Sequence, residues 1–285
     1  MPDVATLVAR RLHEAGCRFA FGIPGGEVLH LIDALERAGI RFVLCKHENA
    51  GGFMAAGSFH ATGAPAVVVA TVGPGVANLV NAVADAYLDR VPMIVLTGCV
   101  DAGDAVGFTH QILDHRALLA PVVKAGFTLV PDAAGAMVDK ALAIATDPRP
   151  GPVHLDVPIR VARAEASGPV PRRATPAPVG PAAGAELDAA RALLRASRRP
   201  IAVAGLDILA RPETAARVAS FLERFEIPLI TTYKAKGVLP EDHPLALGAA
   251  GLSPKADAVL LPLVGRSDCV LLFGYDPVEM RAGWR

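Results

Sequence analysis

Aromatic residues, net charge and long apolar runs are all scarce in this sequence of 285 residues. Phe, Trp and Tyr make up 5% of it, and 28 Lys and Arg balance 28 Asp and Glu. A neutral chain without a basic stripe offers no electrostatic footprint for nucleic acid or an anionic membrane surface. The most apolar stretch, residues 66–80, is broken by Gly73, Pro74 and Gly75 before it could span a bilayer. No export signal is visible at the start of the sequence, so we expect a cytoplasmic protein.

Cysteine is also scarce, and its spacing carries no metal or redox motif. The sequence has four cysteines, Cys17, Cys45, Cys99 and Cys269, which lie far apart inside apolar or helical patterns. No CxxC pair exists, and no cluster of Cys and His has the spacing of a zinc site. We therefore expect free thiols and no metal ligands among these residues.

What the sequence does have is a regular alternation of short apolar runs and helical patterns over residues 1–165. The runs at residues 66–71 and 93–97 show no alternation of apolar and polar positions. Such runs are typical of parallel strands that are covered on both faces. A repeated order of strand, turn and helix predicts a three-layer α/β/α unit around a parallel sheet.

The composition changes after this first unit. Residues 163–184 contain five prolines and almost no large apolar residue, so we interpret residues 166–185 as an interdomain linker. A helical pattern and three apolar runs then predict a second, smaller parallel α/β unit over residues 186–285. With only three predicted strands, this second sheet is expected to be incomplete. The three runs lie at residues 201–204, 228–231 and 269–274.

Three polar or glycine-rich segments, residues 21–26, 46–49 and 71–78, follow predicted strands. The carboxyl ends of parallel strands lie at one sheet edge, where loops and helix N-termini bind ligands. We therefore expect the three segments to converge. The third segment is not a dinucleotide fingerprint, because Asn78 stands where the third glycine would be needed.

Glu48 is the candidate catalytic residue in these segments. It follows the apolar run 41–45 and opens a helix rich in Gly and Ala. An acid in a first helical turn also suits the helix dipole, so its position alone leaves a purely structural role open. Gly51, Gly52 and Gly57 each cost the helix about 1 kcal/mol relative to Ala. The close approach of a ligand or a partner chain would justify that cost.

Taken in order, these segments resemble the thiamine diphosphate-dependent family of acetolactate synthase and benzoylformate decarboxylase. Residues 24–26 are similar to the opening Pro-Gly-Gly turn of that family, residues 47–48 to its catalytic glutamate motif, and residues 73–75 to its Gly-Pro-Gly turn. Further matches extend the resemblance over nearly the whole chain. They lie at residues 110–124, 150–158 and 236–248.

The resemblance implies thiamine diphosphate as the cofactor and a 2-oxo acid as the substrate, with decarboxylation or carboligation as the reaction. Glu48 matches the acid that bonds N1′ of the cofactor's aminopyrimidine, while the cofactor itself performs the carbon chemistry. The remaining site residues that the resemblance implies are Gly25, Gly26, Pro74 and Asn78 around the pyrimidine, and Gln111 and His110 on the substrate side.

The third domain of this family, whose Gly-Asp-Gly…Asn motif holds magnesium and the diphosphate, has no match in the sequence. We therefore expect the chain to be inactive unless a partner or a further domain supplies that half. The resemblance also implies a homo-oligomer, because the family's active sites form between two chains. The turn at residues 204–207 lacks the glycine cluster of flavin-binding members, which argues against bound FAD. The alternative is a non-catalytic α/β binding or scaffolding module of the same ancestry.

Overall fold

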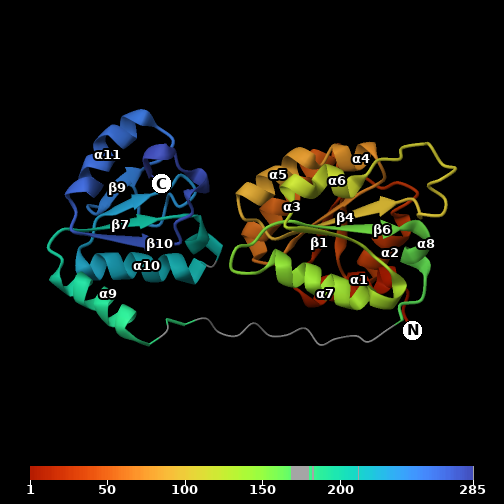
Figure 1. Ribbon diagram of the computed structural model, residues 1–285, viewed down its shortest axis with the longest axis horizontal. Helices are drawn as coiled ribbons and strands as arrows, with labels where there is room; N and C mark the ends of the chain where they lie inside the picture. The colour runs from red at the N-terminus through yellow and green to blue at the C-terminus, as the bar shows by residue number, and fades with distance from the viewer. Residues whose placement is uncertain (168–179, 182, 211, 285) are drawn as a thin grey trace. The chain divides into compact units, whose positions relative to one another are not determined.

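The computed structural model describes residues 1–167, 180–181, 183–210 and 212–284, and the chain forms two compact units, residues 1–174 and 175–285 (Figure 1). The proline-rich linker predicted at residues 166–185 falls largely outside the described residues. The predicted α/β class is confirmed, since every strand pair in the two described sheets is parallel.

The first unit contains a six-stranded sheet with the order β2-β1-β3-β4-β6-β5. The central strand β3 has the sequence AVVVA and is buried along its whole length. This burial on both faces explains why its sequence shows no alternation. The strands are β1 (Phe19–Gly22), β2 (Arg41–Leu44), β3 (Ala66–Ala70), β4 (Met93–Cys99), β5 (Ala125–Thr128) and β6 (Val153–Pro158).

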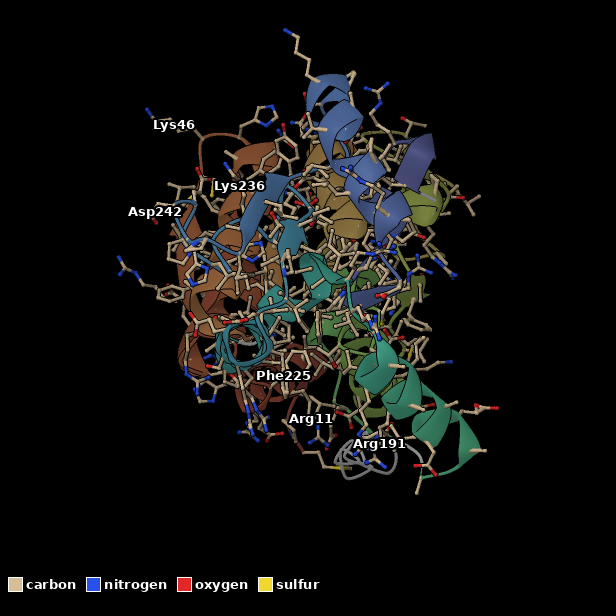
Figure 2. All side chains as sticks on the ribbon, turned by 90° about the vertical axis from the view of Figure 1, so that its left-hand side faces the viewer. Arg11, Lys46, Arg191, Phe225, Lys236 and Asp242 are labelled. Atoms are coloured by element: carbon tan, nitrogen blue, oxygen red, sulfur yellow. The ribbon has the colours of Figure 1, made fainter. Side chains whose placement is uncertain are left out.

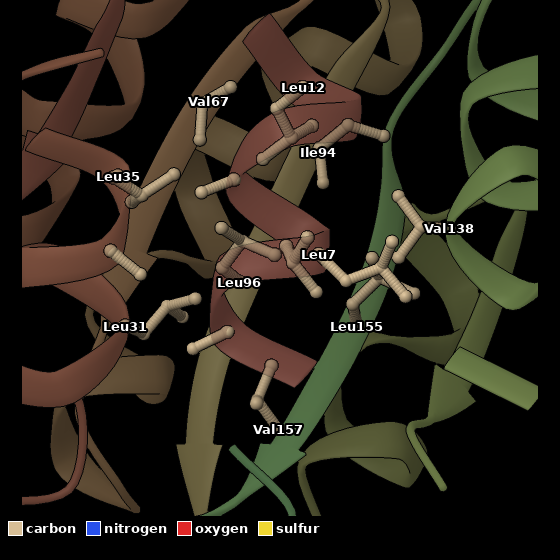
Figure 3. Packing of buried hydrophobic residues seen from close by; sticks show 14 of the residues in the cluster. Leu7, Leu12, Leu31, Leu35, Val67, Ile94, Leu96, Val138, Leu155 and Val157 are labelled. Carbon is tan, nitrogen blue, oxygen red and sulfur yellow. The ribbon is translucent and has the colours of Figure 1, made fainter. Parts of the chain in front are cut away.

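Helices cover both faces of this sheet (Figure 1). On one face lie α1 (Val4–Glu14), α2 (Leu29–Arg37) and α7 (Ala134–Ala145), whose apolar side chains meet those of β3, β4 and β6 in one core (Figure 3). On the other face lie α3 (Glu48–Thr62), α5 (Val80–Leu88) and α6 (His115–Leu119), which enclose a second core. The six-stranded unit is therefore the three-layer sandwich that the alternating pattern predicts.

Two details of the first unit differ from the sequence expectation. The sequence after Gly73-Pro74-Gly75 predicts one helix that runs to about Tyr87, but the structure breaks it at residues 78–79 into α4 (Pro74–Ala77) and α5. The edge strand β5 was not predicted, because the sequence AGFT is only partly buried and carries no apolar run.

The two ends of the first unit are joined to each other. The backbone N–H of Val4 donates to the carbonyl of Ala164 at 2.9 Å, and that of Ala166 donates to Pro2 at 2.9 Å. The N-terminal ammonium group lies 2.8 Å from a carboxylate oxygen of Glu165. The short helix α8 (Ile159–Arg163) brings the chain back to this point.

The second unit has a four-stranded parallel sheet in the order β10-β7-β8-β9. One core lies between this sheet and α10 (Pro212–Phe225), and another includes side chains of α11 (Pro254–Arg266). Strand β9 was not predicted, because Gly248 has a φ of +104° and the pairing with β8 is irregular at its start. The remaining elements are α9 (Ala185–Ala196), β7 (Pro200–Ala204), β8 (Leu229–Thr231), β9 (Ala246–Ala249) and β10 (Cys269–Phe273).

Candidate functional site

The three predicted segments do converge, because β2, β1 and β3 are neighbours in the sheet and run parallel. Strand β1 leads into the turn at residues 24–26, β2 leads into Glu48, and β3 leads into Gly73. Parallel strands place their carboxyl ends at the same edge. The expected position of Glu48, beyond the carboxyl end of β2, is therefore confirmed.

Glu48 is the first residue of α3, and its side chain faces inward. The ring of His47 caps the helix, with Nδ1 accepting from the backbone N–H of Asn49 at 3.2 Å. Glu48 is only 6% exposed, whereas Lys46 in the same turn is exposed and projects outward (Figure 2). An acid that served the helix dipole alone would gain by staying in water, because burying a carboxylate is costly. Its burial indicates a more specific role.

The Glu48 carboxylate is held between two features of the segment after β3. Asn78, at the break between α4 and α5, donates its side-chain amide to Glu48 Oε2 at 2.9 Å. A Cβ atom built on Gly75 would lie 3.4 Å from Glu48 Oε1. Asn78 therefore engages one oxygen, while the absence of a side chain at Gly75 lets the main chain of α4 pack close to the other.

Gly73 holds the turn before α4 in a conformation that side chains disfavour, with φ +56° and ψ −107°. A Cβ atom built on Gly73 would lie 2.4 Å from the carbonyl oxygen of Gln111, so the two main chains are in close approach. Pro74 is the first residue of α4, where a missing N–H costs nothing. The structure thus brings Gln111 against the turn through its backbone, while the side chains of Gln111 and His110 are exposed.

The turn at residues 24–26 lies close to the end of β3. A Cβ atom on Gly25 would lie 2.7 Å from Thr71 Oγ1, whereas one on Gly26 would meet nothing within 4 Å among the described residues. Thr71 donates its hydroxyl to Glu27 Oε2 at 2.5 Å. Glu27 is a second carboxylate at this edge that the sequence reading missed, and its place directly after the Pro-Gly-Gly turn is the signal that could have found it.

The glycines of α3 have two different surroundings. Cβ atoms on Gly51 and Gly52 would lie 3.3 Å from Cys45 Sγ and 2.4 Å from Ala82 Cβ, respectively. A Cβ atom on Gly57 would meet nothing within 4 Å in the part of the chain that the structure describes. The close approach expected from these glycines is therefore made by the chain itself at Gly51 and Gly52.

A buried polar network lies beneath the turn at Gly73. Gly73 donates its backbone N–H to His115 Nε2 at 2.9 Å, and His115 Nδ1 lies 2.9 Å from Asp156 Oδ1. Thr97 donates its hydroxyl to the same oxygen at 2.6 Å, and its own oxygen lies 2.7 Å from His154 Nε2. Burial raises the pKa of the Asp156 carboxyl, but the hydrogen bonds from His115, His154 and Thr97 outweigh it and hold that pKa well below its ordinary value.

The described residues contain neither a cluster of metal ligands nor a membrane-spanning helix. Within those residues, no group of three or more His, Cys, Asp and Glu side chains is arranged to hold a metal ion. Among the same residues, no helix has the length and apolar character needed to cross a bilayer.

Two family profiles match the sequence. The profile of the thiamine pyrophosphate enzyme N-terminal TPP binding domain matches residues 2–118, and that of the thiamine pyrophosphate enzyme central domain matches residues 187–284. The chain belongs to the thiamine pyrophosphate enzyme family. Within this family, the first match contains Glu48 and the Gly-Pro-Gly turn, which confirms the resemblance inferred from the motifs.

Curated relatives in the thiamine pyrophosphate enzyme family are longer than this chain. The probable 2-ketoarginine decarboxylase of Pseudomonas aeruginosa is 36% identical over 271 residues, which cover 90% of this chain and 47% of the relative. The acetolactate synthase of Bacillus subtilis is 33% identical over 282 residues, or 96% of this chain and 48% of the relative. The large subunit of acetolactate synthase isozyme 1 of Escherichia coli is 35% identical over 252 residues, which cover 87% of this chain and 44% of the relative. The chain spans about half the length of these relatives.

Proposed function

We propose that this chain supplies the aminopyrimidine-binding half of a thiamine diphosphate-dependent enzyme that acts on a 2-oxo acid. The observation that carries this proposal is the buried Glu48 carboxylate at the sheet edge, with one oxygen bonded to Asn78 and the other packed close to Gly75. A carboxyl group in this setting is suited to hydrogen-bond a ring nitrogen, here N1′ of the cofactor's aminopyrimidine. When bound, thiamine diphosphate supplies the carbon nucleophile that attacks the substrate carbonyl.

The surrounding residues have supporting roles in this proposal. Gly25 and Pro74 would shape the wall around the aminopyrimidine, together with Gly26, and Asn78 would fix the orientation of the Glu48 carboxylate. The loop that carries His110 and Gln111 would line the substrate side. Support for this arrangement comes from the close approach of the Gln111 main chain to Gly73. Relatives named as an acetolactate synthase and as a 2-ketoarginine decarboxylase support a 2-oxo acid as the substrate class.

We propose that a further domain, beyond these 285 residues, holds the diphosphate and its magnesium ion. Magnesium is usually bound through carboxylates and phosphate oxygens, and no suitable group of side chains occurs among the described residues. That domain would belong to the same polypeptide or to a partner.

We propose that the enzyme works without FAD. In the first turn of the second unit, the space beside Gly205 is filled by the backbone of the loop after β10. A Cβ atom on Gly205 would lie 2.5 Å from the carbonyl oxygen of Gly274, so two loops meet backbone to backbone there.

We also propose that two copies of the chain associate through α3 and α5. Phe53 and Met54 on α3 are 42% and 44% exposed, and Leu88 on α5 is 52% exposed. A twofold interface uses the same patch on both copies, and a stable one buries at least about 1,000 Å² in total. Large apolar side chains on the helix that begins with Glu48 would suit such an interface.

The proposed activity is tested by reconstitution. The chain is mixed with a polypeptide comprising the part of the Bacillus subtilis acetolactate synthase that this chain does not match. Thiamine diphosphate, magnesium and a panel of 2-oxo acids, including pyruvate, are then added, and carbon dioxide release is measured. Turnover that requires both polypeptides supports the proposal. A complex that forms and binds the cofactor but turns over no 2-oxo acid would favour the non-catalytic module instead.

A further inference from the structure

His115 has no role in the function proposed above. It is buried, although the loop that precedes it is exposed. It is the first residue of α6, whose N-cap is Asp114, and it is only 4% exposed. Both ring nitrogens have partners, which are the backbone N–H of Gly73 and the carboxylate of Asp156, each at 2.9 Å. A fully partnered, buried imidazole joins α6 to the turn after β3 and to the end of β6.

The two partners fix the proton on the ring. A backbone N–H only donates, so His115 Nε2 presents its lone pair to Gly73. The neutral ring therefore carries its proton on Nδ1 and donates it to Asp156 Oδ1. The Asp156 carboxylate is itself held by the Thr97 hydroxyl at 2.6 Å, and Thr97 lies directly opposite Asp156 in the pairing of β4 with β6. The carboxylate therefore has a second donor besides the imidazole.

The turn at Gly73 needs such an anchor because its backbone conformation is a rare one. The carbonyl of Gln111 crowds Gly73 from one side, and His115 accepts its N–H. Residues 111 and 115 of one segment thus contact the same glycine. Two residues further along, Gly75 packs close to the Glu48 carboxylate, since a Cβ atom there would lie 3.4 Å from Oε1.

From this geometry we infer that His115 is a positioning residue that fixes the turn at residues 73–75 beside Glu48. The inference rests on the proposed function and extends it to a residue that touches neither cofactor nor substrate. Asp156 sets the tautomer, His115 holds the turn, and the turn determines the wall that an aminopyrimidine would meet. Gln111 contacts the same residue, Gly73. A shift of the loop that carries Gln111 would therefore also move the turn at residues 73–75.

Two substitutions separate the two hydrogen bonds of His115. In His115→Gln the side-chain amide reaches the position of Nε2, so its oxygen can still accept from Gly73 while the bond to Asp156 is lost. In His115→Asn the shorter amide reaches the position of Nδ1, so it can still donate to Asp156 while Gly73 loses its acceptor. Thr97→Val is the matched control, because it removes a different hydrogen bond to Asp156 and leaves the Gly73–His115 bond in place.

The test uses the full 285-residue chain and two NMR measurements. The first is hydrogen exchange of the Gly73 amide, and the second is titration with 4-amino-5-hydroxymethyl-2-methylpyrimidine, the pyrimidine part of thiamine. In His115→Asn we expect exchange about tenfold faster and probe affinity about tenfold lower, as for the loss of one buried hydrogen bond. His115→Gln and Thr97→Val should stay within about threefold of the wild type in both measurements.

The inference is overturned if His115→Asn leaves Gly73 exchange unchanged, or if Thr97→Val weakens probe binding as much as His115→Asn does. Because the isolated chain is expected to bind at about 1 mM or weaker, the titration extends to about 100 mM of the probe. A wild-type chain that does not bind the probe even at that concentration would contradict the proposed function, whereas Gly73 exchange would still decide the role of His115. If the His115 variants do not fold, the ring ¹⁵N spectrum of the wild type decides. A proton on Nδ1 supports the assignment, and a proton on Nε2 overturns it.

Discussion

The side-chain amide of Asn78 donates to Glu48 Oε2 at 2.9 Å and so ties the start of α3 to the break between α4 and α5. At this break the backbone of Asn78 stays in the right-handed helical region, with φ −66° and ψ −18°. Asn78 is exposed as a residue, yet its amide reaches a buried carboxylate. Glu48 thus has one oxygen bonded to Asn78 and the other beside Gly75 at this edge of the sheet.

Glu48→Gln should lower kcat of the reconstituted enzyme by about 10² to 10⁴, the usual contribution of a positioned acid or base. Glutamine keeps the size of the side chain and can still accept from Asn78, so folding should not change. Glu36→Gln, at an exposed position on α2, is the control and should keep wild-type activity. Steady-state kinetics with a 2-oxo acid decides the matter, and a Glu48→Gln enzyme within threefold of the wild type would count against the assignment.

The isolated chain should bind thiamine diphosphate only weakly, with a Kd of about 1 mM or higher. One hydrogen bond from Glu48 and apolar contact with a ring are worth only a few kcal/mol. The turn at residues 73–75 also lacks a donor at Pro74, which has no N–H. Isothermal titration calorimetry with and without magnesium measures this directly. Micromolar, magnesium-dependent binding would show that this chain contains a diphosphate site.

Two glycines of α3 should respond in opposite directions to alanine. Gly52→Ala places a methyl group 2.4 Å from Ala82 Cβ, so the packing of α3 on α5 must shift. We expect a loss of about 1–2 kcal/mol in the free energy of unfolding. Gly57→Ala on the exposed side should add up to about 1 kcal/mol through helix propensity. Urea denaturation of both variants gives the comparison, and equal effects would mean that the α3–α5 contact is less close than described.

Asp156→Asn should destabilise the chain by about 2–3 kcal/mol at pH 7, because a buried acceptor of charge-assisted hydrogen bonds is lost. The pKa of Asp156 is lowered from 3.8 in the folded state. A lowered folded pKa stabilises the fold above the ordinary value, and this contribution is lost progressively as the pH falls from that value toward the folded pKa. The difference between wild type and variant should therefore shrink below about pH 4. Urea denaturation at pH 7 and pH 3 tests this, and a constant difference would contradict it.

Phe53→Lys should weaken self-association at least about tenfold, because it places a charge in the proposed apolar interface of α3. The control is Leu193→Lys on α9, a leucine that is 55% exposed in the second unit and outside that interface. Sedimentation velocity at micromolar concentration should show a dimer for the wild type and the control, and monomer for Phe53→Lys. A wild-type chain that sediments only as a monomer would refute the interface.

Those parts of the site could be predicted whose signal lies within a few consecutive residues of the sequence. A buried apolar run followed by a polar or glycine-rich turn predicts where a parallel strand ends, and this placed Glu48, Gly73 and Pro74 at one edge. The pairing of His115 with Asp156 could not be predicted in this way. The two residues lie 41 positions apart, and their contact depends on the neighbouring positions of β4 and β6 in the sheet.

The elements that were not predicted share a physical cause. Strands β5 and β9 lie at sheet edges, where partial burial removes the apolar run that marks a central strand. The break after α4 has no Pro or Gly at Asn78 to announce it. At that position the side chain bonds Glu48 while the backbone keeps helical dihedral angles, so a polar residue inside a helical pattern gives no local sign of the break.

The joined ends of the first unit make it a transferable module. With Val4 bonded to Ala164 and Ala166 bonded to Pro2, the polypeptide enters and leaves this unit at one point. Such a unit can be cut out, exchanged between related proteins or circularly permuted with little disturbance of its core. A short linker placed across these ends, with new termini opened in an exposed loop far from Glu48, would yield a self-contained unit that carries the Glu48 site.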